Sequence, residues 1–426
     1  MIGPRPPGFL FPLAITVILA GCTSEAVRPY PQGDPIVIGA PLALTGSLSD
    51  EGQMAQEGYY FCRNWVNAKG GVHVQGSSRP LLIAVQDDQS RASVSAAVTE
   101  RLISQDHVRL LLGPVGNLLA DRDAAVAESH QVPILLSSTA ESTFNRQYQY
   151  VFGVASPASH YLQGVIDMAL SLTPAPQSAA ILFARDSFST EVATDLNAYA
   201  ATRGLSVVYF ESFPGGTNDL RGKLGAIAAA APDLVLGVGA PSDAAVTMEA
   251  ARQLNVHPRL FAFTSGPGEP GFLSDMKTAE YVYGSTQWAA GARLPIGYFV
   301  DGRTYAAQFL AAYGQRPDAT SAAATAACLA LEVAIERAGS TEPQAVRSAL
   351  AALDLQTFYG EIRFDSRGLN VFKPMEVEQV QDGLAVVVWP PAAATGRPRY
   401  PMPGWDQRLG TLGAQKLGQM REQPHG

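Results

Sequence analysis

Short apolar runs alternate with longer stretches of helical periodicity along the first part of the chain. The first apolar run, at 36–40, precedes a stretch at 50–68 whose apolar residues share one broad face, and Gly70-Gly71 ends it. Strands are then predicted at 81–85, 110–112 and 132–136, and helices at 93–104 and 118–129. Strands that alternate with helices in this way predict a parallel sheet with helices on both faces.

The same alternation restarts near residue 160 and predicts a second unit of the same design. Its strands are expected at 178–183, 206–210, 234–237 and 260–263, and its helices at 160–172, 189–203, 220–230 and 244–254. Helices at 298–313, 321–338 and 343–353 and strands at 360–364, 375–381 and 386–389 follow. The pattern therefore predicts an α/β protein with two doubly wound lobes and a cleft between them.

The two ends of the chain do not share this periodicity. An apolar run at 9–20 is too short to span a bilayer and suits the core of a signal peptide over residues 1–21. The run ends in Leu-Ala-Gly-Cys, which resembles a bacterial lipobox and implies cleavage before Cys22 and lipidation of its thiol; ordinary cleavage is the alternative. We expect residues 22–34 to form a linker after the lipidated cysteine, and residues 390–426 to form a loose tail.

Charge and motif content exclude several classes of function. The formal net charge is −8 and no basic cluster occurs, which argues against nucleic acid binding. The sequence has no nucleophile–base motif, no P-loop and no metal-ligand spacing, so we predict no enzyme activity, no metal and no cofactor. Cys62 and Cys328 fall in predicted helices, where we favour buried free thiols over a disulfide, although an exported protein permits one.

Loops at the carboxyl ends of the predicted strands are the expected ligand-binding elements, because ligands of open α/β sheets bind there. The loop at 113–117, GPVGN, turns sharply from strand to helix. It either presents free N–H groups to a polar ligand or simply uses Asn117 to cap the helix. The other loops are also rich in Gly, Ser and Thr, which suits a small polar ligand and equally suits plain turns; they span 45–46, 137–140, 185–189, 239–242 and 264–266.

Several segments together resemble the branched-chain amino acid-binding family, the solute receptors of leucine/isoleucine/valine-type ABC transporters. They include IVIGAPLALTGSLSDEG, LLLGPVGN, VPILLSSTA and PDLVLGVGAPSDA, and the resemblance spans about 35–389. It implies a type I periplasmic-binding fold with a three-strand hinge. Lobe 1 would comprise 35–155 plus 285–358, and lobe 2 would comprise 156–284 plus 359–389.

The same resemblance implies a non-enzymatic protein outside the cytoplasm that hands a small solute to a membrane permease driven by an ATPase. The lipid at Cys22 would tether it to a bacterial membrane. A ligand-sensing receptor that reports to a membrane signalling partner is the alternative function for the same fold.

The resemblance also implies where the solute binds. Asn117 takes the place of a family Ser, and Thr139 or Ala140 that of a Thr, and these groups grip the ligand carboxylate. In lobe 2, Phe188 takes the place of a Tyr, and Ala240 or Pro241 that of an aromatic residue. The acid that pairs with the ligand ammonium maps near Ser265. Loss of that acid favours amides or carboxylates over a free amino acid, unless the nearby Glu269 replaces it. The candidate ligand-binding residues are Thr45, Asn117, Ser137, Ser138, Thr139, Ala140, Phe188, Ala240, Ser265 and Trp288. Gln287 and Trp288 are placed at the cleft mouth, although a core position suits Trp288 equally well.

Overall fold

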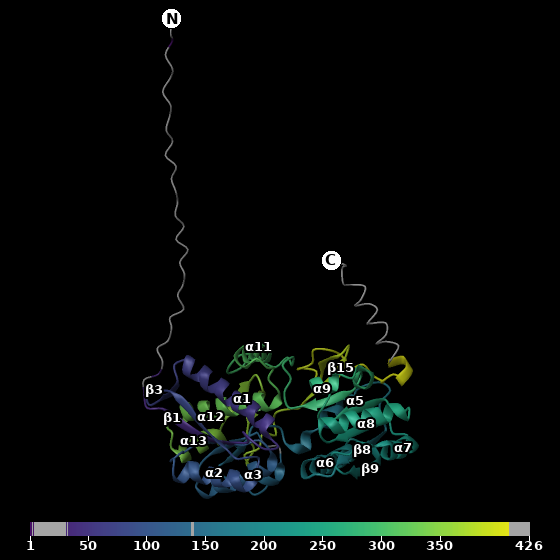
Figure 1. Ribbon diagram of the computed structural model, residues 1–426, viewed down its shortest axis with the longest axis horizontal. Coiled ribbons are helices and arrows are strands. Elements are labelled where there is room, and N and C mark those ends of the chain that lie inside the picture. The colour runs from purple at the N-terminus through teal and green to yellow at the C-terminus, as the bar shows by residue number, and fades with distance from the viewer. Residues whose placement is uncertain (2, 4–30, 32, 138–139, 409–426) are drawn as a thin grey trace.

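Two α/β lobes lie side by side in the computed structural model, which describes residues 1, 3, 31, 33–137 and 140–408 (Figure 1). The predicted signal peptide, Cys22, the pair 138–139 and the last residues from 409 therefore lie outside the described part, apart from residues 1 and 3. The sequence prediction of two doubly wound lobes is confirmed.

Lobe 1 is built on a parallel sheet with the strand order β4-β1-β5-β6-β7. The strands are β1 (Ile36–Leu42), β4 (Leu81–Asp87), β5 (Leu111–Leu112), β6 (Ile134–Leu136) and β7 (Val151–Gly153). The helices of this lobe are α1 (Ser49–Ala68), α2 (Ala92–Ser104), α3 (Asn117–Ser129), α4 (Glu141–Phe144), α11 (Gly302–Tyr313), α12 (Ala319–Ala338) and α13 (Pro343–Ala351). Sequence periodicity did not predict two small hairpins, β2 (Val72–Val74) with β3 (Ser77–Arg79) and β13 (Asp354–Thr357) with β14 (Gly360–Arg363), as hairpins.

Lobe 2 is built on a larger sheet with the strand order β16-β15-β12-β11-β10-β8-β9, in which only β15 and β16 run antiparallel to their neighbours. The strands are β8 (Ser178–Ala184), β9 (Ser206–Phe213), β10 (Leu234–Val238), β11 (Leu260–Phe263), β12 (Tyr283–Thr286), β15 (Glu376–Gln381) and β16 (Leu384–Trp389). The helices are the short η1 (Ala158–His160), α5 (Gln163–Leu170), α6 (Ser187–Thr202), α7 (Arg221–Ala230), α8 (Pro241–Gln253), α9 (Pro270–Leu273) and α10 (Met276–Ala279).

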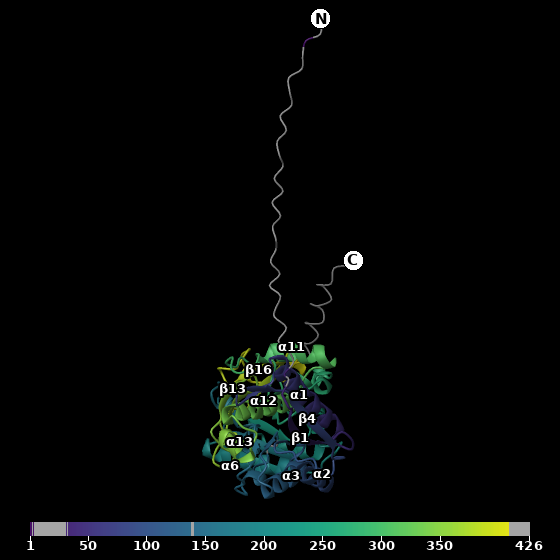
Figure 2. The same cartoon turned by 90° about the vertical axis from the view of Figure 1, so that its left-hand side faces the viewer.

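Helix α12 forms the centre of lobe 1 and lies beside α1 (Figure 2). It is long and apolar enough to cross a membrane, but 83% of its most apolar window is buried inside the protein. Gly58 lets α1 approach α12 closely, because a Cβ there would come within 2.4 Å of the Ser321 carbonyl oxygen. Thr325 donates a hydrogen bond to the Gly58 carbonyl oxygen at 2.9 Å. These contacts identify α12 as a core helix.

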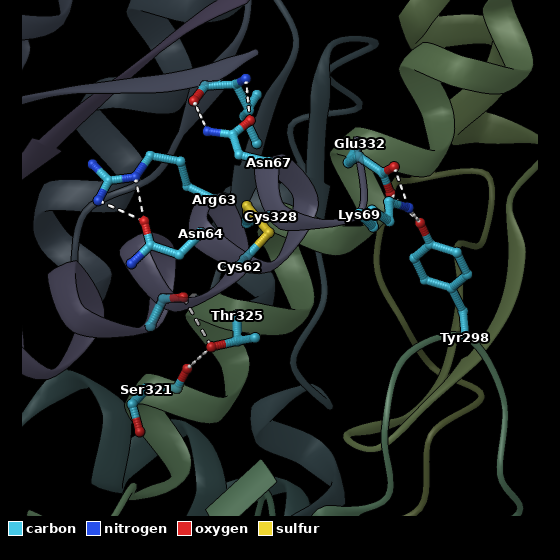
Figure 3. Close-up of a disulfide and its surroundings, with 12 residues drawn as sticks. Cys62, Arg63, Asn64, Asn67, Lys69, Tyr298, Ser321, Thr325, Cys328 and Glu332 are labelled. Carbon is cyan, nitrogen blue, oxygen red and sulfur yellow. Dashed lines mark hydrogen bonds and ion pairs between the residues drawn. A yellow bond between two sulfur atoms is a disulfide. The ribbon is translucent and has the colours of Figure 1, made fainter. Parts of the chain in front are cut away.

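A disulfide joins α1 to α12, so the preference for free thiols at Cys62 and Cys328 was wrong (Figure 3). The two residues are 266 positions apart in the sequence, yet their Cα atoms lie only 6.1 Å apart. Both helices were predicted correctly, but the pairing depends on α12 packing against α1 after the chain has passed through lobe 2. Nothing in the local sequence around either cysteine records that contact.

The third passage between the lobes lies later in the chain than the sequence predicted. Hairpin strand β14 and Phe364 pack in the core of lobe 1, and Leu369 packs beneath its sheet. The chain enters lobe 2 only with Val377 of β15. The expected boundary at 358/359 therefore differs from the structure, because β14 pairs with β13 and stays with lobe 1.

The segment from 390 to 408 was expected to be loose, but it packs on lobe 2. The Trp405 indole N–H donates to the Val256 carbonyl oxygen at 2.8 Å, and Met402 joins the same apolar core. Arg408 is buried and donates to the Thr278 carbonyl oxygen at 3.1 Å. Single buried side chains, those of Met402, Trp405 and Arg408, hold this segment in place, and they follow no regular apolar period.

Two buried carboxylates share one hydroxyl group between α2 and α3. Ser95 Oγ lies 2.7 Å from Asp123 Oδ2 and 3.5 Å from Asp88 Oδ2, and all three residues are inaccessible to solvent. Burial raises the pKa of Asp123 to about 7 and that of Asp88 to about 6. Ionising either group inside the protein therefore disfavours the folded state.

We expect Asp123→Asn to flatten the pH dependence of folding stability. Because the folded-state pKa of Asp123 is raised, its favourable contribution is complete below the unfolded pKa of about 4 and is lost as the pH rises through about 7. At pH 8 the variant should be more stable by roughly 2 to 4 kcal/mol. Urea unfolding at pH 5 and pH 8 measures this, with the exposed Asp354→Asn as control. An unchanged slope with pH would contradict the expectation.

Candidate ligand-binding cleft

The lobe 1 side of the site is formed by loops that follow β1, β5 and β6. Thr45 follows β1, where Asp87 holds it through its hydroxyl at 2.7 Å and its backbone N–H at 3.2 Å. Gly116, with φ of 85°, turns the chain from β5 into α3, and Asn117 is the first residue of that helix. A side chain at Gly116 would be strained by that backbone angle. The sharp turn noted in the sequence is thus real.

The loop after β6 contains the next group of predicted residues. Ser137 is half-buried at its start, and buried Ala140 precedes α4. Ser138 and Thr139 lie outside the described residues. Gly113 at the end of β5 packs against this loop's strand, since a Cβ there would meet the Leu136 side chain at 2.3 Å. The carboxyl ends of β5 and β6 are therefore adjacent, as the predicted site requires.

The lobe 2 side is formed by loops after β8, β10 and β11. Phe188 lies in the first turn of α6, with its ring edge-on to Tyr161 at a centroid distance of 5.3 Å. Ala240 precedes α8 and lines a small pocket with Gly239 and Asp243. Ser265 donates its hydroxyl to the Gly239 carbonyl oxygen at 2.8 Å, which ties the β11 loop to the β10 loop.

One hydrogen bond connects the two sides directly. The backbone N–H of Glu141, next to Ala140, donates to Glu191 Oε1 at 3.0 Å. Glu191 lies on α6, the helix that carries Phe188 in its first turn. Glu141, which follows Ala140 in lobe 1, therefore contacts the lobe 2 helix on which Phe188 lies.

Acidic side chains of lobe 1 lie close enough to raise the pKa values of acidic side chains of lobe 2. The pKa of Glu191 and that of Asp195 are raised by burial and by the charge of Glu141 across the cleft. At the loop after β11, the pKa of Glu269 is raised by burial and by two lobe 1 carboxylates, those of Asp318 and Glu51. Sequence reasoning named only Glu269 among these acids. The others are isolated acidic residues in or next to helices, and from sequence alone such residues are interpreted as solvent-exposed.

Trp288 does not lie at the cleft mouth. Its indole is buried in lobe 1, and its ring centroid lies 5.5 Å from that of Tyr305. The indole N–H donates to the Phe358 carbonyl oxygen at 3.2 Å. The N–H is the only hydrogen-bonding group of an indole, so the side chain has its partner inside the protein. Trp288 is therefore a core residue, so of the two positions that the sequence left open the structure has the core and not the cleft mouth.

Gln287, its neighbour, joins the three passages between the lobes. Ser156 donates its backbone N–H to Gln287 Oε1 at 3.0 Å, and Gln287 Nε2 donates back to the Ser156 carbonyl oxygen at 2.9 Å. Ser156 Oγ donates to the Lys373 carbonyl oxygen at 2.9 Å. One residue from each passage thus takes part in a single buried network, which we call the hinge network.

Among the described residues, no group of His, Cys, Asp or Glu could hold a metal ion. The sequence profile of the periplasmic binding protein family matches residues 35–384. The chain belongs to this family.

Relatives and solved structures agree with this assignment. The Leu/Ile/Val-binding protein homolog 7 of Brucella suis biovar 1 is 26% identical over 414 residues, which cover 92% of this chain and 99% of the relative. The Leu/Ile/Val-binding protein homolog 8 of Brucella abortus is 23% identical, covering 86% of this chain and 93% of that protein. The resemblance to the leucine/isoleucine/valine-type family, drawn from the sequence, is confirmed.

The fold of this periplasmic binding protein matches solute receptors with different ligands. The substrate-binding protein LivJ of Streptococcus pneumoniae, in complex with isoleucine, aligns with a TM-score of 0.70 and 20% identity, covering 84% of this chain and all (100%) of LivJ. A solute-binding protein of R. palustris, in complex with benzoate, aligns with a TM-score of 0.65 and 16% identity. The alignment covers 86% of this chain and 98% of that protein. The family consists of non-enzymatic, extracytoplasmic binding proteins.

Proposed function

We propose that this periplasmic binding protein captures an amino acid or a related small polar solute between its lobes. It then delivers the solute to a membrane permease powered by an ATPase. The observation that supports the proposal is the hydrogen bond from the Glu141 backbone N–H of lobe 1 to Glu191 on α6 of lobe 2, which brings the two lobes into contact. Solute binding would replace or reinforce such contacts and favour the closed arrangement of the lobes. Lipidation of Cys22 would keep the receptor near its permease.

A thermal-shift screen of the chain from Thr23 to Gly426 tests the proposal. The panel contains branched-chain and other amino acids, their amides, and aliphatic and aromatic carboxylates. A ligand at a hundred times its dissociation constant adds about 2.7 kcal/mol of stability, which raises the melting temperature by several degrees. The absence of any shift across the panel would count against small-solute capture. Mass spectrometry of the protein from membranes tests the lipid at Cys22.

We expect Phe188→Ala to weaken solute binding about tenfold, because the half-buried ring contacts Tyr161 at the cleft and truncating such an aromatic costs more than 1 kcal/mol. Ser138→Ala should act in the same direction. Calorimetric titration with a solute found in the screen measures both effects. Phe210→Ala, on the exposed outer strand β9, is the matched control and should bind normally. Unchanged affinity in both cleft variants would mean that the solute binds elsewhere.

A further inference from the structure

Two carboxylates lie at the cleft end of strand β15. Because β15 runs antiparallel to β12, its first residues lie beside the carboxyl end of that strand, with Glu376 opposite Thr286 and Glu378 opposite Gly284. Carboxyl ends of the parallel strands form the ligand-binding edge of the sheet. Val377, between the two acids, points into the core on the other face. Glu376 and Glu378 therefore share the face that the loop after β11 covers.

The Glu376 carboxylate is buried without a full set of partners. The residue is 2% exposed, and its Oε2 has no hydrogen-bond partner in the described part of the chain. Glu378 Oε2 lies against the loop after β11, where a Cβ on Gly268 would approach it to 2.5 Å. Burial raises the pKa of each carboxyl group to about 7, and the charge of Glu376 adds to the rise for Glu378. A buried carboxylate without a cation is costly.

Lys373 does not satisfy both acids. Its ammonium donates to the Gln287 carbonyl oxygen at 2.5 Å and lies 4.6 Å above the Tyr359 ring, within the hinge network. Its charge lowers the pKa of Glu376 in opposition to burial, yet among the described residues the two side chains form no ion pair. Lys373 therefore carries one positive charge beside two carboxylates, and its ammonium contacts the Gln287 carbonyl oxygen and the Tyr359 ring instead.

We infer that the captured solute carries a cationic group, such as an ammonium, and that Glu376 and Glu378 bind this group at the hinge end of the cleft. The inference rests on the proposed function and specifies the charge of the solute. It replaces the expectation that the missing acid at Ser265 favours carboxylates or amides without an ammonium. The acidic residues of the two lobes, Glu191 and Glu269 among them, disfavour an anionic solute in the same way.

The first experiment compares solutes that differ only in charge. Leucine and leucinamide carry an ammonium, 3-methylbutylamine carries an ammonium alone, and 3-methylbutanoate carries a carboxylate alone; benzylamine and benzoate form a second pair. Thermal shift and calorimetric titration on the chain from Thr23 to Gly426 should detect binding of ammonium compounds at least tenfold tighter than of the matched carboxylates. Equal or tighter binding of the carboxylates would overturn the inference and leave solute capture intact. No binding by any compound would count against both.

The second experiment removes the charges. Glu376→Gln and Glu378→Gln should each weaken the ammonium compounds at least tenfold, while Glu211→Gln, on the outer strand β9, should leave them unchanged. Circular dichroism and the melting temperature check that the variants fold. Unchanged affinity for ammonium compounds in both folded variants would overturn the assignment. If one variant does not fold, the other variant and the comparison of solutes on the unmodified protein still decide the question.

Discussion

Replacing both cysteines of the disulfide, Cys62→Ala with Cys328→Ala, is expected to lower the free energy of unfolding by about 3 to 5 kcal/mol. The bond closes a loop of 266 residues, so its loss frees a large part of the unfolded chain. Both sulfur atoms are also buried, and alanine leaves part of their volume empty between α1 and α12.

Urea unfolding of the oxidised protein and the double variant measures this loss. The unmodified protein, refolded with its thiols reduced, is the control, and it should fall close to the variant because it lacks the same covalent link. A loss below about 1 kcal/mol would mean that the packing of α12 already holds lobe 1 together without the bond.

Truncating Trp405 is expected to cost about 3 to 4 kcal/mol, although the residue lies in a segment without regular secondary-structure periodicity. Its ring is 5% exposed, its N–H is bonded to the Val256 carbonyl oxygen, and the Arg408 guanidinium lies 4.1 Å from the ring centre. Trp405→Ala removes all three contributions and weakens the cover over lobe 2.

Chemical unfolding of Trp405→Ala tests this cost directly. Leu384→Ala is the control, because Leu384 belongs to the same lobe but is 67% exposed, and its truncation should cost less than about 0.5 kcal/mol. Equal effects of the two substitutions would show that the segment from 390 to 408 contributes little to stability.

The sequence was sufficient to predict most regular elements, because they are long or strongly patterned. Strand β1, helix α1 and helix α12 were predicted within two residues of their observed bounds. The sequence did not predict which distant segments of the chain contact each other. Cys62 meets Cys328 only through tertiary packing, and β14 stays with lobe 1 only because it pairs with β13. Helical periodicity at 298–301 was also misleading, since α11 begins at Gly302 after its Asp301 cap.

For the candidate site, the sequence predicted which strands the candidate residues follow, but it did not predict which side chains are buried. Asn117, Ala140 and Phe188 follow strands β5, β6 and β8 as predicted, because the alternation of elements sets where the strands end. Trp288 lies in the core, although an indole next to a passage between lobes fits a cleft or a core equally well from sequence alone. Glu376 was placed in a predicted strand, but its burial follows from the antiparallel return of β15, which periodicity does not report.

The interleaving of the two lobes along the chain has a consequence for folding during synthesis. The sheet of lobe 1 is complete once Gly153 has appeared, but α12, which covers it, begins at Ala319. A chain that emerges from its N-terminus must therefore expose the apolar face of that sheet while the first part of lobe 2 follows. Neither lobe can reach its final packing before the C-terminal third is available. Such a delay makes assembly of both lobes a late, nearly simultaneous event.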